Sequence, residues 1–588
     1  MKPLLRVIRY FKPYKGLAIG TLAAATGSTL VAMVGPYLIG LAIDEAIAGA
    51  DARLLGQLVV GIIVAMLLRD GLNSLRIRLN NRLEQQVIYD MRNEVYRHLQ
   101  TLPLSFYSDR STGELMSRVV DDVNRVERVL LDGTEQVFVA LLTLCGVAAI
   151  MFSMSPSLAW VALIPVPFLA LGAWLYIRRR HVLYKNAREK AAAMNAILHD
   201  SLSGLLQVKI FNREREQAER FARGADGYRH AQLDIMYSWS LFSPSMNFLG
   251  GLGTVLVLIV GGNAIIRGSD TVTYGTLVSF MMLLGLFYEP INRLHSLNNL
   301  WQDALAASSR VFEILDTQPD IVEPPQPKHI HGRARGQVDF ENVHFAYSNG
   351  RKVLHGINLH VKPGETIALV GPTGAGKTTL VQLIPRFYDV VSGAVKVDGI
   401  DVRELSLESL RRQIAVVSQE PFLFNATIRE NILMGNPDAD EDKMKWAAEM
   451  ANIRTFIERL PQQYDTLVGE RGVKLSVGEK QRISIARALL KDAPIVILDE
   501  ATASVDTITE MQIQEALERL REGRTTFVIA HRLSTVRTAD RIACIKDGRI
   551  AEIGTHDELM RLDGLYASLV EHQNATGRLD REVVPDLV

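Results

Sequence analysis

Hydrophobic positions are concentrated in the first half of the chain. Residues 17–43 contain no charged side chain, and a helix of that length exceeds the roughly 20 residues needed to cross the hydrocarbon core of a membrane. The charge-free stretch 136–177 is interrupted by "SMSPS" and is long enough for two helices joined by a tight turn. The pattern predicts six membrane helices, in residues 17–43, 54–68, 136–177 (two helices), 238–266 and 271–288.

Two connections between these stretches are too long to be turns. Residues 69–135 and 178–237 are polar but keep a helical pattern, so we expect the membrane helices to continue into the cytoplasm. They would return through short cross-helices near residues 108–114 and 211–221, which we interpret as coupling helices. A pair of soluble helical hairpins without a coupling role is the alternative that the spacing leaves open.

Basic residues mark one side of the predicted bundle. Lysine and arginine precede the first stretch and "RRR" follows the fourth, whereas "DEAIAGADAR" between the first two is mostly acidic. Cytoplasmic flanks are enriched in basic residues, so this side is predicted to be cytoplasmic, with both chain ends on it. The N-terminal segment has no cleavage site of small residues, and we interpret it as a retained amphipathic elbow rather than a signal peptide.

The pattern changes after the last membrane stretch. Residues 316–337 form a proline-rich linker, and beyond it short β-branched runs alternate with helical patterns. Such alternation is typical of an α/β domain with a parallel core sheet. We therefore divide the chain into a transmembrane domain at 1–315, the linker at 316–337, an α/β domain at 338–575 and a tail at 576–588.

Composition and charge narrow the classes of partner. The hydrophobic fraction of 48% and the mean hydropathy of +0.10 are high for a soluble protein of 588 residues. The formal net charge is zero, so no global field attracts nucleic acid or an anionic surface. Cys145 and Cys544 are too far apart in the chain to indicate a disulfide framework or a metal site.

The first chemical motif is "TIALVGPTGAGKTTL", an apolar strand followed by a glycine-rich loop and a helix. This is the context that a phosphate-binding P-loop requires. Backbone amides of the loop surround phosphate oxygens, Lys377 reaches the β and γ phosphates, and the Thr378 hydroxyl ligates Mg²⁺. The predicted nucleotide-binding residues of this loop are Gly371, Pro372, Thr373, Gly374, Ala375, Gly376, Lys377, Thr378 and Thr379.

The second motif is the acid pair in "APIVILDEATASVD". A buried strand, residues 495–498, carries Asp499 to the metal and Glu500 beside it, where Glu500 could polarise a water for attack on the γ phosphate. Paired acids after an apolar strand are otherwise often a helix N-terminal feature. The P-loop in the same chain favours the catalytic interpretation.

These motifs occur with "VVSQEPFLF", "LSVGEKQR" and "VIAHRLST" in the order seen in ATP-binding cassette proteins, and the chain resembles that family over about residues 1–575. With a membrane bundle ahead of one cassette, it resembles a bacterial half-size exporter of the multidrug and lipid-flippase type, with the type IV transmembrane fold. The implied fold is a membrane α-helical bundle fused to a cytoplasmic α/β P-loop NTPase cassette. The implied cofactors are ATP and Mg²⁺.

The resemblance also implies roles for single residues outside the P-loop. Tyr347 matches the aromatic residue that stacks on adenine, and Gln419 matches the glutamine that contacts Mg²⁺ and the attacking water. His531 matches the histidine that contacts the γ phosphate, and Asp506 lies in the loop that communicates across the cassette dimer. Each residue type is commonly structural by itself, so these roles depend on the family match. The catalytic set is Glu500, His531, Lys377 and Gln419, and the metal set is Thr378, Gln419 and Asp499.

The stretch "LSVGEKQR" is a plausible helix start by itself, with Ser476 as N-cap and Glu479 as its capping-box partner. In the family this signature completes the ATP site of a second cassette, and Ser476 and Gly478 fit that role. The chain departs from the common family form at Val477 and Glu479. We expect Glu479 to turn away from the triphosphate, to cap its helix or pair with a base. We favour a homodimer, with a heterodimer as the alternative.

The predicted function is ATP-driven export or flipping of a hydrophobic or amphipathic substrate, lipid or drug-like, across the bacterial inner membrane. An ATP-gated channel or regulatory membrane protein shares every cassette motif and is the alternative. No nucleic-acid partner is expected. Glu289 and Arg293, near the cytoplasmic end of the sixth stretch, are the nearest approach to intramembrane charge and are spaced to pair one turn apart, and we do not assign them to a cargo site.

Overall fold

The structure is a computed structural model that describes residues 2–108, 110–128, 133–268, 272–347, 350–499, 506–530 and 536–576. The chain forms two compact units. One consists of Met1–Gln100 with Thr112–Thr317, and the other of Thr101–Ser111 with Gln318–Val588. We describe them separately as the membrane unit and the cassette unit. Glu500, His531 and the tail beyond Thr576 lie outside the described residues.

The membrane unit is built almost entirely from long helices. Five of them, among the residues that the structure describes, are long and apolar enough to cross a membrane by length and composition. The sixth predicted stretch lies largely in α12. The helices are α1 (Lys2–Phe11), α2 (Lys15–Leu41), α3 (Ala52–Thr101), α5 (Thr112–Ser117), α6 (Val123–Arg128), α7 (Thr134–Met154), α8 (Pro156–Leu163), α9 (Pro165–Ser203), α10 (Leu205–Ile210), α11 (Glu214–Ile266) and α12 (Tyr274–Asp316).

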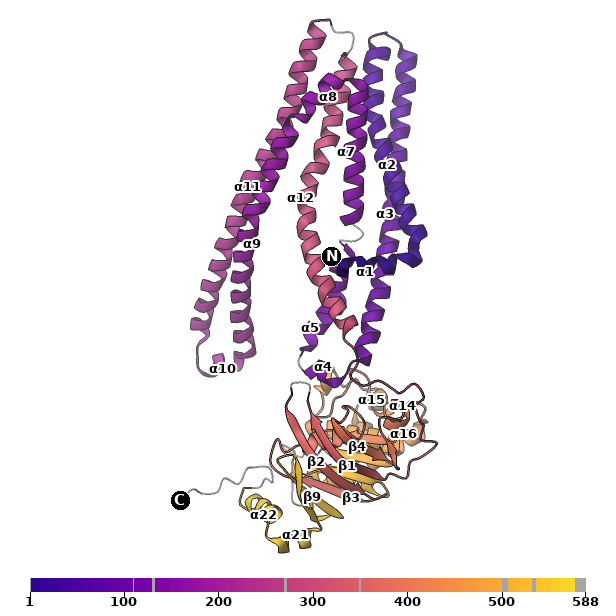
Figure 1. Cartoon of the computed structure of the whole chain (residues 1–588), viewed down its shortest axis with the longest axis vertical. Helices are drawn as coiled ribbons and strands as arrows, with labels where there is room; N and C mark the ends of the chain where they lie inside the picture. Colours follow the sequence, from indigo (N-terminus) through magenta and orange to yellow (C-terminus); the bar gives the residue numbers. More distant parts are fainter. Residues whose placement is uncertain are drawn as a thin grey trace. The chain divides into compact units, whose positions relative to one another are not determined.

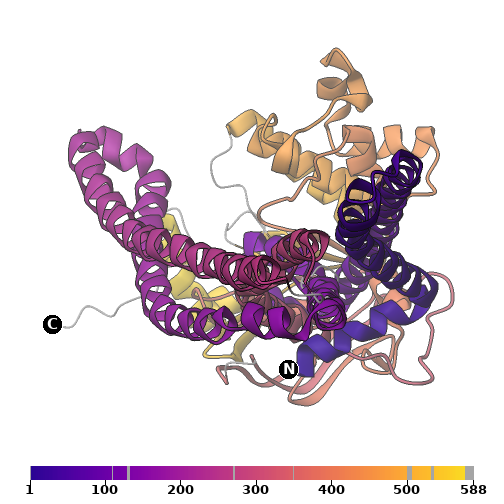
Figure 2. The same cartoon turned by 90° about the horizontal axis from the view of Figure 1, so that it is seen from above.

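Three helix pairs organise this unit. Helices α2 and α3 run side by side, α9 and α11 form a second long pair, and α7 and α12 lie between the two pairs (Figures 1 and 2). In the half of the pair nearer to α10, α9 and α11 pack on each other through Ala187, Ala231 and Ile235. Helix α12 packs on α2, α7 and α11, and therefore joins the two halves of the bundle.

Small residues set the register of the antiparallel α2–α3 pair. A Cβ atom added to Gly27 would lie 3.2 Å from Leu72, and one added to Gly20 would lie 3.2 Å from Leu79. Near the other end, Gly61 of α3 faces Leu38 of α2. At these positions a leucine side chain of one helix lies over a glycine of the other. This register decides which part of α3 lies level with the charge-free stretch of α2.

The end of the membrane unit that contains the segment Thr112–Arg128 is held by charged pairs. Arg310 of α12 donates two hydrogen bonds, of 2.7 and 2.6 Å, to the carboxylate of Asp122, whose side chain is only 4% exposed. Arg118 bonds Glu114 at 2.6 Å and Glu313 at 3.1 Å. These contacts tie α12 to the segment Thr112–Arg128, although the two are far apart in the sequence.

The short cross-helices differ in part from the sequence prediction. The first, α4 (Leu104–Ser108), ends where the predicted range 108–114 begins and belongs to the cassette unit. The second is α10, which precedes the predicted range 211–221. The break falls at Phe211 and Asn212, where Asn212 has a φ of +50°, and residues from Glu214 onward already belong to α11. Hydrophobic periodicity does not separate two helical segments joined by so short a turn.

The cassette unit contains two sheets. The smaller has strand order β2-β1-β4-β5, and the larger has the order β10-β9-β3-β8-β7-β6. In the larger sheet β9, β3, β8, β7 and β6 are parallel, and β10 is antiparallel to β9. The strands are β1 (Val338–Ala346), β2 (Lys352–Val361), β3 (Thr366–Val370), β4 (Ser392–Val397), β5 (Ile400–Asp401), β6 (Ile414–Val417), β7 (Ile495–Asp499), β8 (Thr525–Ile529), β9 (Arg541–Lys546) and β10 (Arg549–Gly554).

Helices and the smaller sheet cover the larger sheet and bury most of its side chains. Strands β3 and β8 are buried along their whole length, as expected for central parallel strands with both faces covered. One hydrophobic cluster lies toward the smaller sheet and a second lies among the helices. The helices are α13 (Lys377–Gln382), α14 (Leu407–Arg412), α15 (Ile428–Leu433), α16 (Glu441–Met450), α17 (Arg454–Arg459), α18 (Val477–Lys491), α19 (Thr507–Arg521), α21 (His556–Leu562) and α22 (Leu565–Thr576).

Candidate nucleotide site and membrane cavity

The sheet topology brings the sequence motifs to one edge of the cassette. The P-loop follows β3, Gln419 follows β6, and Asp499 is the last residue of β7. These strands are parallel, so their carboxyl ends meet at the same edge, where α/β proteins bind their ligands. In the sequence, Glu500 comes after β7 and His531 comes after β8. Both residues lie outside the described part of the chain.

The P-loop has a backbone that only glycine accommodates. Gly371 has a φ of +145°, and a Cβ atom there would lie 2.1 Å from the carbonyl oxygen of Ile545. Gly376 has a φ of +105° and is the N-cap of α13. Lys377 is buried, and its ammonium group donates to the carbonyl oxygens of Gly371 at 2.5 Å and Pro372 at 3.0 Å. The lysine is therefore already folded over the loop that would hold the phosphates.

Tyr347 lies next to the P-loop helix. Its hydroxyl is 2.8 Å from the hydroxyl of Thr379, although 32 residues separate them in the sequence. Its half-buried ring packs edge-to-face on Phe345 and Tyr388. The aromatic position predicted for adenine is thus adjacent to the loop predicted for phosphate.

The predicted metal ligands are an exposed hydroxyl on Thr378, an exposed carboxamide on Gln419 and the carboxylate of Asp499. All three offer oxygen atoms, which Mg²⁺ prefers, and Mg²⁺ usually completes its shell with substrate phosphates and water. No cluster of three histidine, cysteine or acidic side chains suited to a metal ion occurs among the residues that the structure describes. The donor set therefore fits a metal that arrives with its nucleotide.

The signature segment lies at the cassette surface. Ser476 and Glu479 form a complete capping box: the Ser476 amide donates to the Glu479 carboxylate at 2.8 Å, and the Glu479 amide donates to the Ser476 hydroxyl at 3.3 Å. The expectation that Glu479 caps its own helix is confirmed. Gly478 is buried, whereas Ser476 is exposed and Val477 is 50% exposed.

Asp506 has a comparable local role in the described structure. Its carboxylate accepts a hydrogen bond of 3.1 Å from the Thr509 amide and caps α19. Hydrogen bonds from the backbone and side chain of Thr509 lower the pKa of Asp506. This residue is therefore an exposed, charged helix cap at the beginning of α19, next to the segment that contains Glu500.

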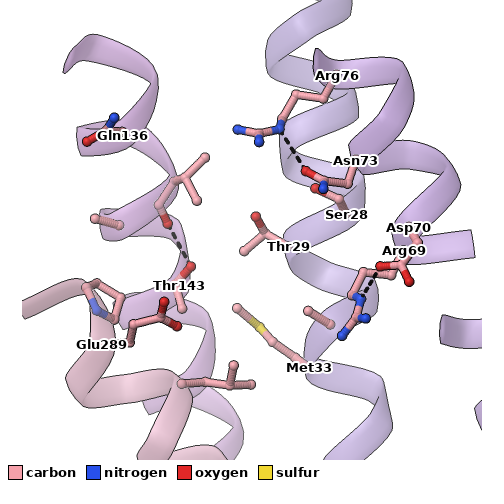
Figure 3. Close-up of a pocket in the computed structure, with 15 residues that line it drawn as sticks. Ser28, Thr29, Met33, Arg69, Asp70, Asn73, Arg76, Gln136, Thr143 and Glu289 are labelled. Carbon is pink, nitrogen blue, oxygen red and sulfur yellow. Dashed lines mark hydrogen bonds and ion pairs between the residues drawn. The ribbon is translucent and has the colours of Figure 1, made fainter. Parts of the chain in front are cut away.

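A second candidate site is a cavity of about 460 Å³ inside the membrane unit. Helices α2 and α3 form one wall, and α7 and α12 form the other (Figure 3). Its uncharged polar lining consists of Ser28, Thr29, Asn73, Gln136 and Thr143. Apolar groups complete it, among them Met33 and Leu286.

Charged side chains line the same cavity. Arg69 donates to Asp70 at 2.9 Å, Arg76 donates to Asn73 at 3.1 Å, and Glu289 lies on the opposite wall. The guanidinium of Arg76 also forms an ion pair with Glu135, whose side chain is 8% exposed. This pair joins α3 to α7 across 59 residues of sequence.

The sequence pattern did not predict that Arg69, Asp70 and Arg76 line a cavity inside the membrane unit. The predicted span 54–68 ends before Arg69, and the sequence interpretation names Glu289 and Arg293 as the charges nearest to an intramembrane position. In the structure, however, Arg69 lies between Gly61 and Leu72, which face Leu38 and Gly27 in the charge-free stretch of α2. Arg69, Asn73 and Arg76 are spaced four and three residues apart and therefore share one face of a helix. This spacing could have indicated a polar face on α3. The side chain of Arg293 is outside the described part of the structure.

The fold and the two sites define a membrane helical bundle fused to a P-loop ATPase. Comparison with known proteins identifies the family of this chain. The profile of the ABC transporter transmembrane region matches residues 18–291, and that of the ABC transporter cassette matches residues 354–503. The chain therefore belongs to the ABC transporter family. It is a half-transporter that couples ATP hydrolysis to transport and that works as a membrane-embedded dimer.

Individual relatives match over nearly the whole length. An uncharacterized ABC transporter ATP-binding protein of Bacillus subtilis (strain 168), YknV, is 40% identical over 97% of this chain and 94% of its own. An ATP-dependent lipid A-core flippase of Syntrophus aciditrophicus (strain SB) is 40% identical over 99% and 96%. A solved structure of a bacterial Atm1-family ABC exporter with ATP bound has a TM-score of 0.78 and 30% identity, and the match covers 97% of this chain and 98% of that one.

Proposed function

We propose that this half-transporter exports or flips an amphiphile, lipid or drug-like, and that the cavity between α2, α3, α7 and α12 receives its polar part. The observation that carries the proposal is the cavity itself, because charged and polar side chains at membrane depth are costly and mark substrate pathways. The similarity to a lipid A-core flippase supports an amphiphilic cargo. We place the protein in the bacterial inner membrane, with both termini and the cassette in the cytoplasm.

The proposed nucleotide site assigns one task to each residue. Tyr347 stacks on adenine, the amides of Gly371–Thr379 and the ammonium of Lys377 bind the phosphates, and Glu500 accepts a proton from the attacking water. His531 and Gln419 orient the γ phosphate and that water. Thr378, Gln419 and Asp499 hold Mg²⁺, which when bound neutralises charge on the phosphates. Ser476, Gly478 and Asp506 act across the dimer on the nucleotide of the other cassette.

We propose a homodimer as the working assembly, with the heterodimer as alternative. The end of the α9–α11 pair supports a second subunit: Leu205, Leu206, Ile210 and Phe211 at α10 are 49–70% exposed. An apolar patch of this kind is typical of an interface. Exposed Ser476 and Val477 fit the same assembly. Light scattering and ATPase assays on the chain expressed alone test it, since a monomer or an inactive assembly contradicts the homodimer.

Transport itself is tested in proteoliposomes. The full chain should move a hydrophobic or amphipathic probe in the presence of ATP, and Glu500→Gln should bind ATP but lose transport and turnover by about 10²-fold or more. Substantial steady-state hydrolysis by Glu500→Gln contradicts the base assignment. An ATP-gated channel would instead pass its solute down a gradient in both directions, without ATP-driven accumulation.

A further inference from the structure

The segment Phe422–Phe424 follows Gln419 closely and belongs to neither sheet of the cassette unit. Phe422 and Phe424 are 52% and 48% exposed, and only Leu423 between them is buried in the core. A segment with one buried side chain buries little apolar area and is held weakly by packing alone. Its place in the cassette therefore depends on the hydrogen bonds that its backbone makes.

Asn431 of α15 holds this segment from one side. The residue is 1% exposed, its Oδ1 accepts a hydrogen bond of 2.9 Å from the Phe424 amide, and its Nδ2 donates to the Phe424 carbonyl oxygen at 3.0 Å. Nδ2 also donates at 2.9 Å to the carbonyl oxygen of Thr427, the N-cap of α15. Because both donors and the acceptor of the carboxamide are used, its orientation is fixed.

Arg487 of α18 holds the segment from the other side. Its Nη1 donates to the Phe422 carbonyl oxygen at 2.9 Å, its Nε to the Asn431 carbonyl oxygen at 2.6 Å, and its Nη2 to the Asn431 Oδ1 at 2.7 Å. Burial lowers the pKa of Arg487, which forms no ion pair with a residue that the structure describes. A desolvated guanidinium is costly unless oxygen atoms surround it, so these contacts fix the side chain and the segment together.

The same segment contacts the residues just before the signature helix. A Cβ atom added to Gly472 would lie 3.1 Å from Leu423, so Leu423 packs on the chain four residues before Ser476. Helix α18 begins after Ser476 and reaches Arg487 about three turns later. There a Cβ atom added to Gly435, after α15, would lie 2.1 Å from the Arg487 carbonyl oxygen. The segment, α15 and α18 therefore form one packed block.

We propose that Arg487 and Asn431 are positioning residues for ATP hydrolysis, because they fix the place of Gln419 relative to Ser476. This inference rests on the proposed nucleotide site, in which Gln419 serves the ATP of its own cassette and Ser476 serves the ATP of the other. The two groups belong to different ATP sites of the dimer, and the packed block connects those sites. Neither Arg487 nor Asn431 is assigned a contact with the nucleotide.

Conservative variants of the two residues provide the test. Arg487→Lys keeps the charge, but a single ammonium nitrogen does not reproduce the three directed hydrogen bonds of the guanidinium. Asn431→Asp keeps the shape but removes both N–H donors, and with them the bond to the Phe424 carbonyl oxygen. In the purified full chain, each variant should lower kcat of ATP hydrolysis about tenfold. Binding of trinitrophenyl-ATP, which depends on the P-loop, should keep the wild-type dissociation constant. If Arg487→Lys does not fold, Asn431→Asp carries the test.

The matched control is Arg524→Lys. Arg524 is also buried, and it donates to the Leu520 carbonyl oxygen at 2.6 Å and to Asp492 at 2.9 Å. It precedes β8 and therefore lies at the edge of the larger sheet opposite to the nucleotide site. This variant should lower the unfolding temperature but keep the wild-type kcat below that temperature. An equal loss of kcat in the two arginine variants would assign Arg487 to stability alone and overturn the inference.

Double variants separate the positioning role from the proposed nucleotide site. If Arg487 acts through Ser476, combining Arg487→Lys with Ser476→Ala should lower kcat no further than the less active single variant does. The same comparison with Gln419→Ala tests the other end of the block. Multiplicative losses in both combinations overturn the inference. If Ser476→Ala alone keeps the wild-type kcat, the proposed action of the signature across the dimer fails, and the combination with Gln419→Ala decides the role of Arg487.

Discussion

The nucleotide site and the membrane cavity are organised in different ways. In the cassette, the P-loop residues are consecutive, and Gln419 and Asp499 lie at the ends of the neighbouring parallel strands β6 and β7. In the membrane unit, the charged groups come from separate helices, and Arg76 of α3 forms an ion pair with Glu135 of α7, which is 59 residues away in the sequence. The first site depends on local backbone geometry, whereas the second depends on helix register. Substitutions in the nucleotide site should therefore mainly lower ATPase activity, whereas substitutions of charged pairs in the membrane unit should mainly lower stability.

The largest effect is expected at Lys377. Lys377→Ala removes the only side-chain charge of the P-loop, so ATPase activity should fall by about 10²-fold or more. Lys443→Ala, at a cassette lysine whose side chain is 69% exposed, is the matched control and should retain wild-type turnover. ATPase rates of the purified full chain provide the measurement. Turnover of the Lys377 variant within a few-fold of the wild type would show that this charge is dispensable.

The signature serine offers a comparison within the cassette. Ser476 and Thr555 both complete capping boxes, so replacing either by alanine should cost about 1 kcal/mol of stability. Only Ser476→Ala should also lower ATPase activity, by about tenfold, because only Ser476 is proposed to face a second nucleotide. Thermal unfolding and ATPase rates are measured on both variants. Equal loss of activity in the two would assign Ser476 to helix capping alone.

The membrane unit should be sensitive to single long-range charge pairs. Asp122→Asn replaces a buried carboxylate that holds Arg310 by two hydrogen bonds, and we expect a loss of about 2 kcal/mol. Asp226→Asn, in a local surface pair with Arg229, should cost less than about 0.5 kcal/mol. Thermal unfolding in lipid nanodiscs measures both. Similar midpoints for the two variants would contradict the role of Asp122 in joining distant segments.

The smallest effect concerns the two cysteines. Burial raises the pKa of Cys544 in β9 to about 12, so at pH 7 to 9 its thiolate fraction stays negligible in the folded cassette. Cys145 lies within α7, a candidate membrane span, and no other described part of the chain covers its side chain. A membrane-permeant maleimide should therefore label Cys145 first, and mass spectrometry of tryptic peptides measures the order. Rapid labelling of Cys544 in the native protein would mean that the cassette core opens readily.

The sequence predicted the class of each half of the chain, which the family matches confirm, and it predicted a P-loop. These features rest on local signals: long charge-free stretches, and glycines whose positive φ and lack of a Cβ atom are needed within one loop. The capping role of Glu479 was predictable for the same reason, since its partner Ser476 is three residues away.

Only the tertiary structure decided which charges lie inside the membrane unit. The sequence pattern ends a span just before Arg69, because an apolar stretch stops there. It predicts the second cross-helix near residues 211–221, because both neighbouring segments are helical. The packing of Gly27 on Leu72 and of Gly61 on Leu38 moves Arg69 to the level of charge-free residues in α2. Helix register depends on side-chain packing between segments distant in the chain, and no local pattern of polar and apolar residues encodes it.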